Sequence, residues 1–204
     1  MSFGGLLMKI GIFGGSFNPI HNGHLQLCNY AKTALDIDRL ILIPTGDNPI
    51  KGKLAVPRED RLNMTRLAAA EGGWEVSEIE IARPGVSYTI DTINELKKTL
   101  PGDYYFITGS DILFQLRKWK RIEELVKQTR FAIAARRGVD NSLMLREAEE
   151  LNAKLGMGII LLEDYLIEEI SSTKIRELIA AGESWEKFLP PAVAEYIWER
   201  GLYL

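Results

Sequence analysis

The chain has 204 residues, of which 46% are hydrophobic and 26% charged, and its net charge is −3. This composition is typical of a folded globular protein, so it excludes a disordered chain, and no apolar run approaches the length of a membrane-spanning helix. The slight negative charge excludes binding to nucleic acid or to anionic membranes by overall attraction, and the single cysteine, Cys28, excludes an internal disulfide.

The first seven residues, 1–7, carry no targeting signal, since a basic start, a long apolar run and a cleavage site are all missing. A second methionine, Met8, stands just before the first strand-like run. We therefore expect residues 1–7 to be a flexible or non-native start. We expect the protein to be cytoplasmic, because a single cysteine is compatible with a reducing compartment.

Short apolar runs alternate with helical patterns along the rest of the chain. The pattern predicts strands at Lys9–Phe13, Arg39–Pro44, Trp74–Ala82, Tyr104–Thr108, Phe131–Ala135 and Ile159–Leu162. It predicts helices at Asn22–Leu35, Pro57–Glu71, Ile90–Leu100, Asp111–Gln128, Asn141–Leu155, Ser172–Ala181 and from Pro190-Pro191 to about Arg200, with a loop at Thr45–Val56. This alternation predicts an α/β fold with a parallel sheet covered by helices on both faces, as one domain over residues 1–204.

The densest chemistry follows the first strand, in Gly-Gly-Ser-Phe-Asn-Pro-Ile-His-Asn-Gly-His at residues 14–24. Ligands of parallel sheets bind at the carboxyl ends of strands, where glycines admit close approach and a helix start offers free N–H groups. His21 and His24 are three residues apart and face one side of the first helical turn. We interpret this stretch as a phosphate site.

Two other interpretations of the stretch are weaker. A plain glycine turn with two surface histidines is the usual case for a lone histidine, but both histidines of the chain fall here. A metal pair would favour a spacing of four and a third ligand, and no carboxylate or cysteine supplies one nearby. We therefore expect no metal held by the protein itself.

A second helix start, Ser-Ser-Thr-Lys-Ile-Arg at residues 171–176, offers hydroxyls for capping or for phosphate and a guanidinium fork at Arg176. Taken alone, it is as compatible with an ordinary helix cap and a solvent-facing arginine. Beside a first phosphate site on the same sheet edge, it favours a hypothesis in which two helix starts hold opposite ends of one triphosphate.

These stretches resemble the nucleotidyltransferase signatures Gly-x-Phe-x-Pro-x-His-x-Gly-His and Ser-Ser-Thr-x-Ile-Arg. Inner stretches make the chain similar, over almost its whole length, to the bacterial nicotinate mononucleotide adenylyltransferase family: Ser87–Thr92, Phe106–Asp111, the Leu116-x-x-Trp119 step and Leu189 through Tyr203. The resemblance implies a Rossmann-like doubly wound fold with C-terminal helices. It also implies transfer of AMP from ATP to nicotinate mononucleotide, with release of pyrophosphate in NAD biosynthesis.

The resemblance also implies roles for individual residues. His21, His24 and Arg176 are the expected catalytic residues. ATP is expected to bind at Gly14, Gly15, Ser16, Phe17, Gly109, Asp111, Ser172, Thr173 and Lys51. Trp119 is expected to stack on the pyridine ring, and backbone N–H groups near Thr89 and Lys120 to receive its carboxylate. Mg²⁺ is expected to arrive with ATP, and no nucleic acid or membrane partner is expected, whereas an oligomer is left open.

Two positions depart from the family pattern. Asn18 stands where the family often has aspartate, which removes a charge beside the triphosphate, and we expect this to be tolerated. Asn48-Pro-Ile-Lys51 replaces a Pro-Pro-His-Lys sequence, so Lys53 competes with Lys51 as the phosphate ligand.

Three alternative functions remain at this point. Phosphopantetheine adenylyltransferase shares the first motif, but the Ser87–Thr92 stretch and Trp119 are not expected in it. Class I aminoacyl-tRNA synthetases carry a related histidine step, yet this chain lacks a Lys-Met-Ser-Lys-Ser signature and an RNA-binding domain. A nucleotide sensor without catalysis need not keep His21, His24 and Arg176.

Overall fold

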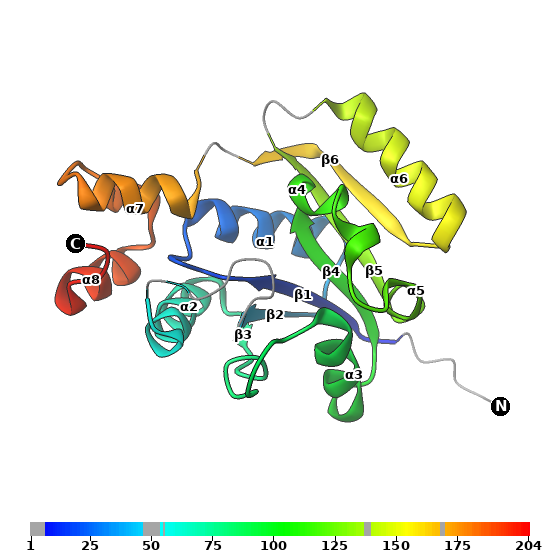
Figure 1. Cartoon of the computed structure of the whole chain (residues 1–204), viewed down its shortest axis with the longest axis horizontal. Coiled ribbons are helices and arrows are strands. Elements are labelled where there is room, and N and C mark those ends of the chain that lie inside the picture. Colours follow the sequence, from blue (N-terminus) through cyan, green and yellow to red (C-terminus); the bar gives the residue numbers. More distant parts are fainter. Residues whose placement is uncertain (1–6, 47–53, 55, 137–139, 168–169) are drawn as a thin grey trace.

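A computed structural model of the chain describes residues 7–46, 54, 56–136, 140–167 and 170–204. Within these ranges, parallel strands form a six-stranded sheet in the order β3-β2-β1-β4-β5-β6 (Figure 1). The strands are β1 (Lys9–Gly15), β2 (Arg39–Pro44), β3 (Glu75–Val76), β4 (Asp103–Gly109), β5 (Thr129–Arg136) and β6 (Ile159–Ile167). The expected doubly wound α/β fold is therefore confirmed.

Helices connect the strands and close the chain. They are α1 (Asn22–Ala34), α2 (Arg58–Gly72), α3 (Thr89–Thr99), α4 (Ser110–Leu113), the 3₁₀ turn η1 (Leu116–Lys118), α5 (Ile122–Leu125), α6 (Asn141–Leu155), α7 (Ser172–Ala180), the 3₁₀ turn η2 (Glu186–Phe188) and α8 (Pro191–Arg200). None of the helices in the described ranges is long and apolar enough to cross a membrane. The cytoplasmic location stays a prediction.

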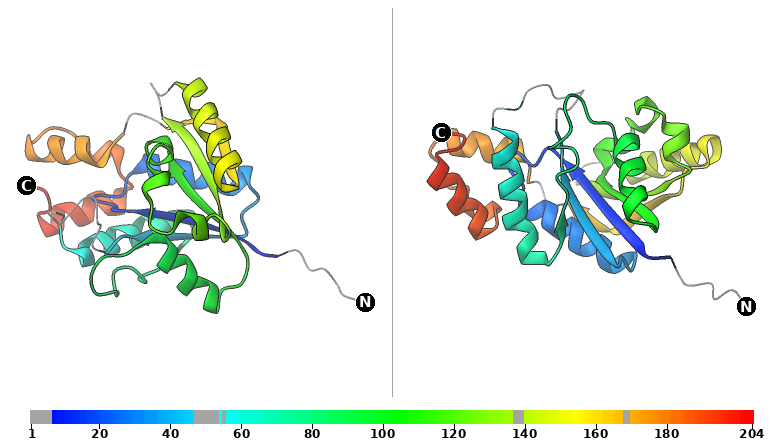
Figure 2. Two further views of the ribbon diagram at one scale, coloured as in Figure 1. Left: turned by 45° about the vertical axis from the view of Figure 1, so that its right-hand side comes forward. Right: turned by 90° about the horizontal axis from the view of Figure 1, so that it is seen from below.

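Strand residues alternate between two hydrophobic cores, because successive side chains of a strand point to opposite faces of the sheet. Phe13, Leu42 and Ile107 pack in one core against α1, α2, α7 and α8. Ile12 and Phe106 pack in the other against α3, α4, α5 and α6. The sheet is thus a middle layer between two layers of helices, as the two views of Figure 2 show.

The chain changes sides of the sheet between β1 and β4. Helices α1 and α2, which follow β1 and β2, lie on one face, whereas α3, which precedes β4, lies on the other. The carboxyl ends of β1 and β4 are neighbours in the sheet, since the two strands pair directly. Such a switch point leaves a crevice beyond the strand ends, which is where open α/β sheets bind ligands.

The expected strand at Trp74–Ala82 was wrong beyond its first residues. Only Glu75 and Val76 pair with β2, and the chain then turns, with the amide of Ala82 donating to the carbonyl of Glu78 at 2.8 Å. The physical reason lies at Glu80, whose side chain is buried and hydrogen-bonded to Thr92 of α3. If the chain continued as a straight edge strand, it would not bring the Glu80 carboxylate to Thr92.

The single helix expected at Asp111–Gln128 was also wrong, because α4, η1 and α5 replace it. The backbone leaves the helical region at Trp119 (φ −72°, ψ 141°) and is left-handed at Arg121 (φ 53°, ψ 43°). Tertiary contacts override the local helical preference: Trp119 packs edge-on against Phe106, and Arg121 pairs with Asp91 of α3.

We predict that Ile107→Ala lowers the free energy of unfolding by about 2–5 kcal/mol, because the substitution leaves a cavity in a fully buried position of β4. Denaturant unfolding followed by circular dichroism measures the change. Leu143→Ala is the control, since this leucine is exposed on α6 and its loss should cost less than about 0.5 kcal/mol. Equal losses in both variants would contradict the assignment of the core.

Candidate active site

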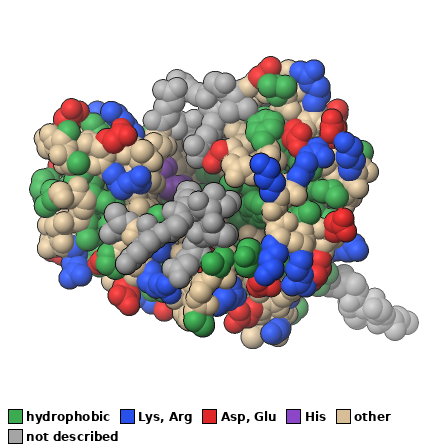
Figure 3. Space-filling view, in the orientation of Figure 1, with side chains coloured by type: hydrophobic (Ala, Val, Ile, Leu, Met, Phe, Trp, Pro, Cys, Tyr) green, Lys and Arg blue, Asp and Glu red, His purple; other side chains and the backbone are tan. Residues whose placement is uncertain are grey.

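A pocket of about 640 Å³ lies beyond the carboxyl ends of β1 and β4. In Figure 3, histidine side chains (purple) are visible in a recess near the middle of the face that is shown. The pocket brings together ten of the residues expected from the sequence: Gly14, Gly15, Ser16, His21, His24, Thr89, Gly109, Asp111, Trp119 and Lys120.

The loop after β1 is shaped by a close approach of backbone and aromatic ring. A Cβ atom at Gly15 would lie 2.6 Å from the ring of Phe17, which a real side chain does not permit. Phe17 itself is buried and has a positive φ of 44°, and the peptide bond between Asn18 and Pro19 is cis. The loop therefore folds back on itself and presents the start of α1 to the pocket. Phe17 is part of this support and does not line the pocket.

The two histidines stack on one another at the start of α1. Their ring centroids are 3.6 Å apart with an angle of 22° between the planes. The backbone N–H of His21 donates to Nδ1 of His24 at 3.1 Å, so in neutral His24 the hydrogen is on Nε2. Gly23 leaves room for this arrangement, because a Cβ there would lie 3.2 Å from Nδ1 of His21.

The second motif meets the first through direct hydrogen bonds. Nη1 of Arg176 donates to the carbonyl of Asn18 at 2.8 Å, and Nη2 donates to Oγ1 of Thr173 at 3.2 Å. The hydroxyl of Ser172 donates to the carbonyl of Pro19 at 2.8 Å. The two helix starts therefore lie beside each other, although Ser172, Thr173 and Arg176 are not among the residues that line the pocket.

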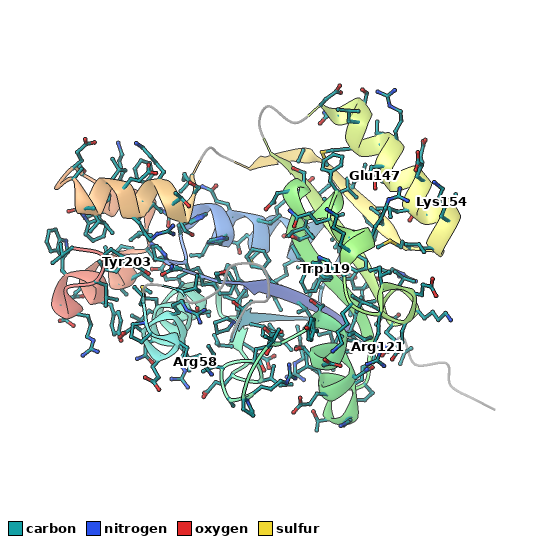
Figure 4. All side chains as sticks on the ribbon, viewed as in Figure 1. Arg58, Trp119, Arg121, Glu147, Lys154 and Tyr203 are labelled. Atoms are coloured by element: carbon teal, nitrogen blue, oxygen red, sulfur yellow. The ribbon has the colours of Figure 1, made fainter. Side chains whose placement is uncertain are left out.

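Asn18 has a structural partner that sequence reasoning missed. The buried amide oxygen Oδ1 of Asn18 accepts from the hydroxyl of Tyr203 at 2.7 Å, which ties the C-terminus to the loop after β1. Burial raises the pKa of Tyr203 well above its ordinary value, so this hydroxyl keeps its proton and remains a donor. A neutral asparagine at position 18 suits this donor, and Tyr203 lies beside α8, as labelled in Figure 4.

Arg61 of α2 is a second residue that was missed. Its Nη1 and Nη2 each donate at 2.7 Å, to the carbonyls of Ser16 and Thr45 respectively. One guanidinium thus ties the loop after β1 to the loop after β2. A signal was present in the sequence, because Arg61 falls at helical spacing on the buried stripe of α2, with Met64, Thr65 and Ala68.

Trp119, labelled in Figure 4, follows η1 and lines the same pocket. Its ring meets Phe106 at right angles with centroids 5.5 Å apart, and Phe131 at 6.2 Å. These edge-on contacts fix the plane of the indole and leave it half-buried at the wall of the pocket. Thr89, the first residue of α3, contributes a helix start to the same wall.

Lys120 is held by neighbours on α3 and just before it. Its Nζ lies 3.8 Å above the ring centroid of Tyr88 and 3.8 Å from Oδ2 of Asp91. Arg121 reaches Oδ1 of the same Asp91 at 3.3 Å. The side chain of Lys120 is therefore engaged in the wall, which is compatible with its expected contribution through a backbone N–H.

Glu80 is a buried acid at the pocket wall that the sequence pattern gave no reason to select. Its Oε1 accepts from Oγ1 of Thr92 at 2.8 Å, and the backbone N–H of Gly46 also donates to the carboxyl group. Burial raises the pKa of Glu80 above its ordinary value, while these donors and nearby Arg83 act against the shift.

Two kinds of cation matter to the expected chemistry, a lysine side chain and a metal ion, and the described residues place neither at this site. Lys51, the expected phosphate ligand, and its competitor Lys53 lie outside the described residues. Among the described residues, no group of three histidine, cysteine, aspartate or glutamate side chains could hold a metal ion.

The chain is similar to known proteins over nearly its whole length. The family model described as cytidylyltransferase-like matches residues 12–178. A protein of Caldicellulosiruptor saccharolyticus named "Probable nicotinate-nucleotide adenylyltransferase" is 40% identical over 198 residues, which are 96% of this chain and 99% of that protein. A protein of Clostridium tetani with the same name is 36% identical over 97% of this chain and 100% of its own length.

A solved structure confirms the fold independently. The nicotinic acid mononucleotide adenylyltransferase of Plasmodium falciparum, complexed with NaAD, superposes with a TM-score of 0.75 at 20% identity, covering 96% of this chain and 97% of the other. The extent and identity of the sequence matches decide the family. The chain belongs to the nicotinate-nucleotide adenylyltransferase family, and it is a nucleotidyltransferase of NAD biosynthesis.

Proposed function

We propose that this enzyme transfers AMP from ATP to nicotinate mononucleotide, giving nicotinate adenine dinucleotide and pyrophosphate. One observation carries the proposal: a single pocket is lined both by the stacked histidines and by Trp119 with the start of α3. The histidines suit phosphates, and Trp119 with the start of α3 suits a flat ring that bears an acid. The Plasmodium falciparum structures, complexed with NaAD and with APC, support this choice of substrates.

The reaction needs alignment more than proton transfer. An oxygen of the acceptor's 5′-phosphate attacks the α-phosphorus of ATP, a new P–O bond forms, and the bond to the bridging oxygen of the β-phosphate breaks. A phosphate monoester is largely dianionic near neutral pH, since its second pKa is about 6, so no general base is required. The protein's task is to position the two anions and to neutralise charge in the transition state.

We assign His21 to the α-phosphate oxygens, and His24 with Arg176 to the leaving pyrophosphate. The tautomer of His24, set by the backbone N–H of His21, leaves Nε2–H as a donor. The partial positive charge at the start of α1 acts on the same anion. Arg176 uses two of its five donors for Asn18 and Thr173 and keeps the others for phosphate.

We assign the adenosine to the side of Gly109 and Asp111, at the end of β4 and the start of α4. We assign the pyridine ring to the face of Trp119, with its carboxylate at the backbone N–H groups near Thr89 and Lys120. Mg²⁺ accompanies ATP in this proposal and supplies charge neutralisation of the phosphates, held by phosphate oxygens and water. The proposed role of Lys51 is to contact phosphate.

We predict that His21→Ala lowers kcat by about a hundred- to a thousandfold, because it removes a preorganised donor to the transition state. A coupled pyrophosphate assay measures the rate, and circular dichroism checks that the fold is intact. Gln26→Ala, at an exposed position of the same helix, should keep normal turnover. Near-normal turnover of the His21 variant would remove this residue from the mechanism.

We predict that Arg176→Lys raises KM for ATP and lowers kcat by about tenfold or more, because one ammonium cannot serve Asn18, Thr173 and phosphate together. Steady-state kinetics with ATP as the varied substrate provide the test. Arg146→Lys on the exposed side of α6 is the matched control. If both variants behave like the wild type, the guanidinium fork has no role in holding the triphosphate.

We predict a preference for the nicotinate over the nicotinamide mononucleotide, because the backbone N–H groups near Thr89 suit a carboxylate. Competition kinetics measure kcat/KM for each acceptor, with 4′-phosphopantetheine included to test the alternative acceptor class. Trp119→Ala should raise KM for nicotinate mononucleotide about tenfold through loss of stacking, whereas Trp198→Ala at the surface should not. Equal kcat/KM for the two pyridine nucleotides would contradict the assignment.

A further inference from the structure

The wall of the pocket between β2 and α3 is held by a buried carboxylate that has no part in the chemistry described above. Glu80 is 8% exposed and lines the pocket. Its carboxyl group accepts from Gly46, in the turn after β2, and from Thr92, in the first turn of α3. One side chain thus connects two segments that approach the pocket from different strands of the sheet.

The link continues beyond Glu80 as a chain of hydrogen bonds. Nη1 of Arg83 donates to Oγ1 of Thr92 at 3.0 Å, and the same hydroxyl donates onward to Glu80 at 2.8 Å. Nη2 of Arg83 pairs with Glu95, one helical turn further along α3, at 2.7 Å. Because the hydroxyl of Thr92 both accepts and donates, the two bonds reinforce one another and fix the rotamer of Thr92.

Gly46 shows how closely the two segments approach. A Cβ atom at this position would lie 2.3 Å from the carbonyl oxygen of Glu80 and 3.5 Å from Oγ of Ser87. Any side chain here would force the turn away from the segment that leads into α3. The short distance between these segments is therefore a specific feature of the wall.

Two residues that line the pocket carry buried hydroxyls without a partner in the described part of the chain. Oγ1 of Thr45 and Oγ of Ser87 are buried and have no hydrogen-bond partner among the residues that the structure describes, and both residues line the pocket. Buried hydroxyls in proteins are normally satisfied. Thr45 precedes Gly46 in the chain, and Ser87 Oγ lies near Gly46, so both hydroxyls belong to the segments that Glu80 connects.

We propose that Glu80 is a positioning residue, whose carboxylate fixes the turn after β2 against the first turn of α3 and so keeps the acceptor end of the pocket in shape. The inference rests on the proposed function, because it assigns this end to the acceptor nucleotide. Glu80 acts through Gly46 and Thr92. The link requires that Gly46 and Thr92 each find a hydrogen-bond acceptor at this place. A neutral amide oxygen has two lone pairs, so it can accept both bonds.

The test compares Glu80→Leu, Glu80→Gln and Thr92→Val in steady-state kinetics with both substrates varied. We expect Glu80→Leu to raise KM for nicotinate mononucleotide at least about tenfold, the effect of losing a buried hydrogen bond, with kcat and KM for ATP within about threefold. Glu80→Gln should stay within about threefold of the wild type in all three constants, since its amide oxygen still accepts. Thr92→Val should change KM in the same direction as the leucine variant.

The double variant Glu80→Leu with Thr92→Val should be no worse than the more impaired single variant, because both substitutions cut the same link. Glu78→Leu is the matched control on the same segment, since Glu78 is exposed, pairs with Arg66 and does not line the pocket. Should the leucine variant of Glu80 fail to fold, Thr92→Val and the rescue by glutamine still decide the question.

An unchanged KM for nicotinate mononucleotide in Glu80→Leu or Thr92→Val would overturn the inference. A fall in kcat and a rise in KM for ATP as large as the rise in KM for nicotinate mononucleotide would also overturn it. If Glu80→Gln raises KM for nicotinate mononucleotide as Glu80→Leu does, the role of residue 80 as a hydrogen-bond acceptor is overturned as well. A wild-type enzyme without turnover of nicotinate mononucleotide would overturn the proposed function. Normal wild-type turnover with unaffected variants overturns this inference alone.

Discussion

The half of the site that we propose for the phosphates depends on two hydrogen bonds between residues far apart in the chain. Arg176 donates to the carbonyl of Asn18, 158 positions away, and Ser172 donates to that of Pro19, 153 positions away. They place the start of α7 beside the start of α1, so that two positive helix ends serve one region. The chain as a whole has a net charge of −3, so the positive charge of these helix starts is a local feature.

The two ends of the pocket are built from different interactions. The phosphate end uses backbone carbonyls as anchors, and Arg61 joins the loops after β1 and β2 through the carbonyls of Ser16 and Thr45. The acceptor end uses side chains: the indole of Trp119 against Phe106, and the carboxylate of Glu80 between Gly46 and Thr92. Hydrogen bonds to backbone carbonyls hold a loop without adding a charged group near the anion. The indole of Trp119 and the buried acid Glu80 instead shape the surface of the pocket.

The arrangement suits a reaction in which both reactants bring their own ionised groups. The stacked rings of His21 and His24 offer N–H donors at fixed positions, and such donors need no rearrangement as charge develops in the transition state. The raised pKa of Glu80 and of Tyr203 reflects burial of polar groups that brace the loops.

The sequence by itself determined the order of elements, both helix starts and the phosphate motif, because a strand end, a glycine bend and a helix start lie within the consecutive residues 14–24. Local periodicity and local chemistry coincide there. Only the tertiary structure decided the breaks at Trp119 and Arg121 and the inward turn at Glu80. Those conformations are fixed by partners on other elements, Phe106, Asp91 and Thr92, so no pattern within the segments themselves records them.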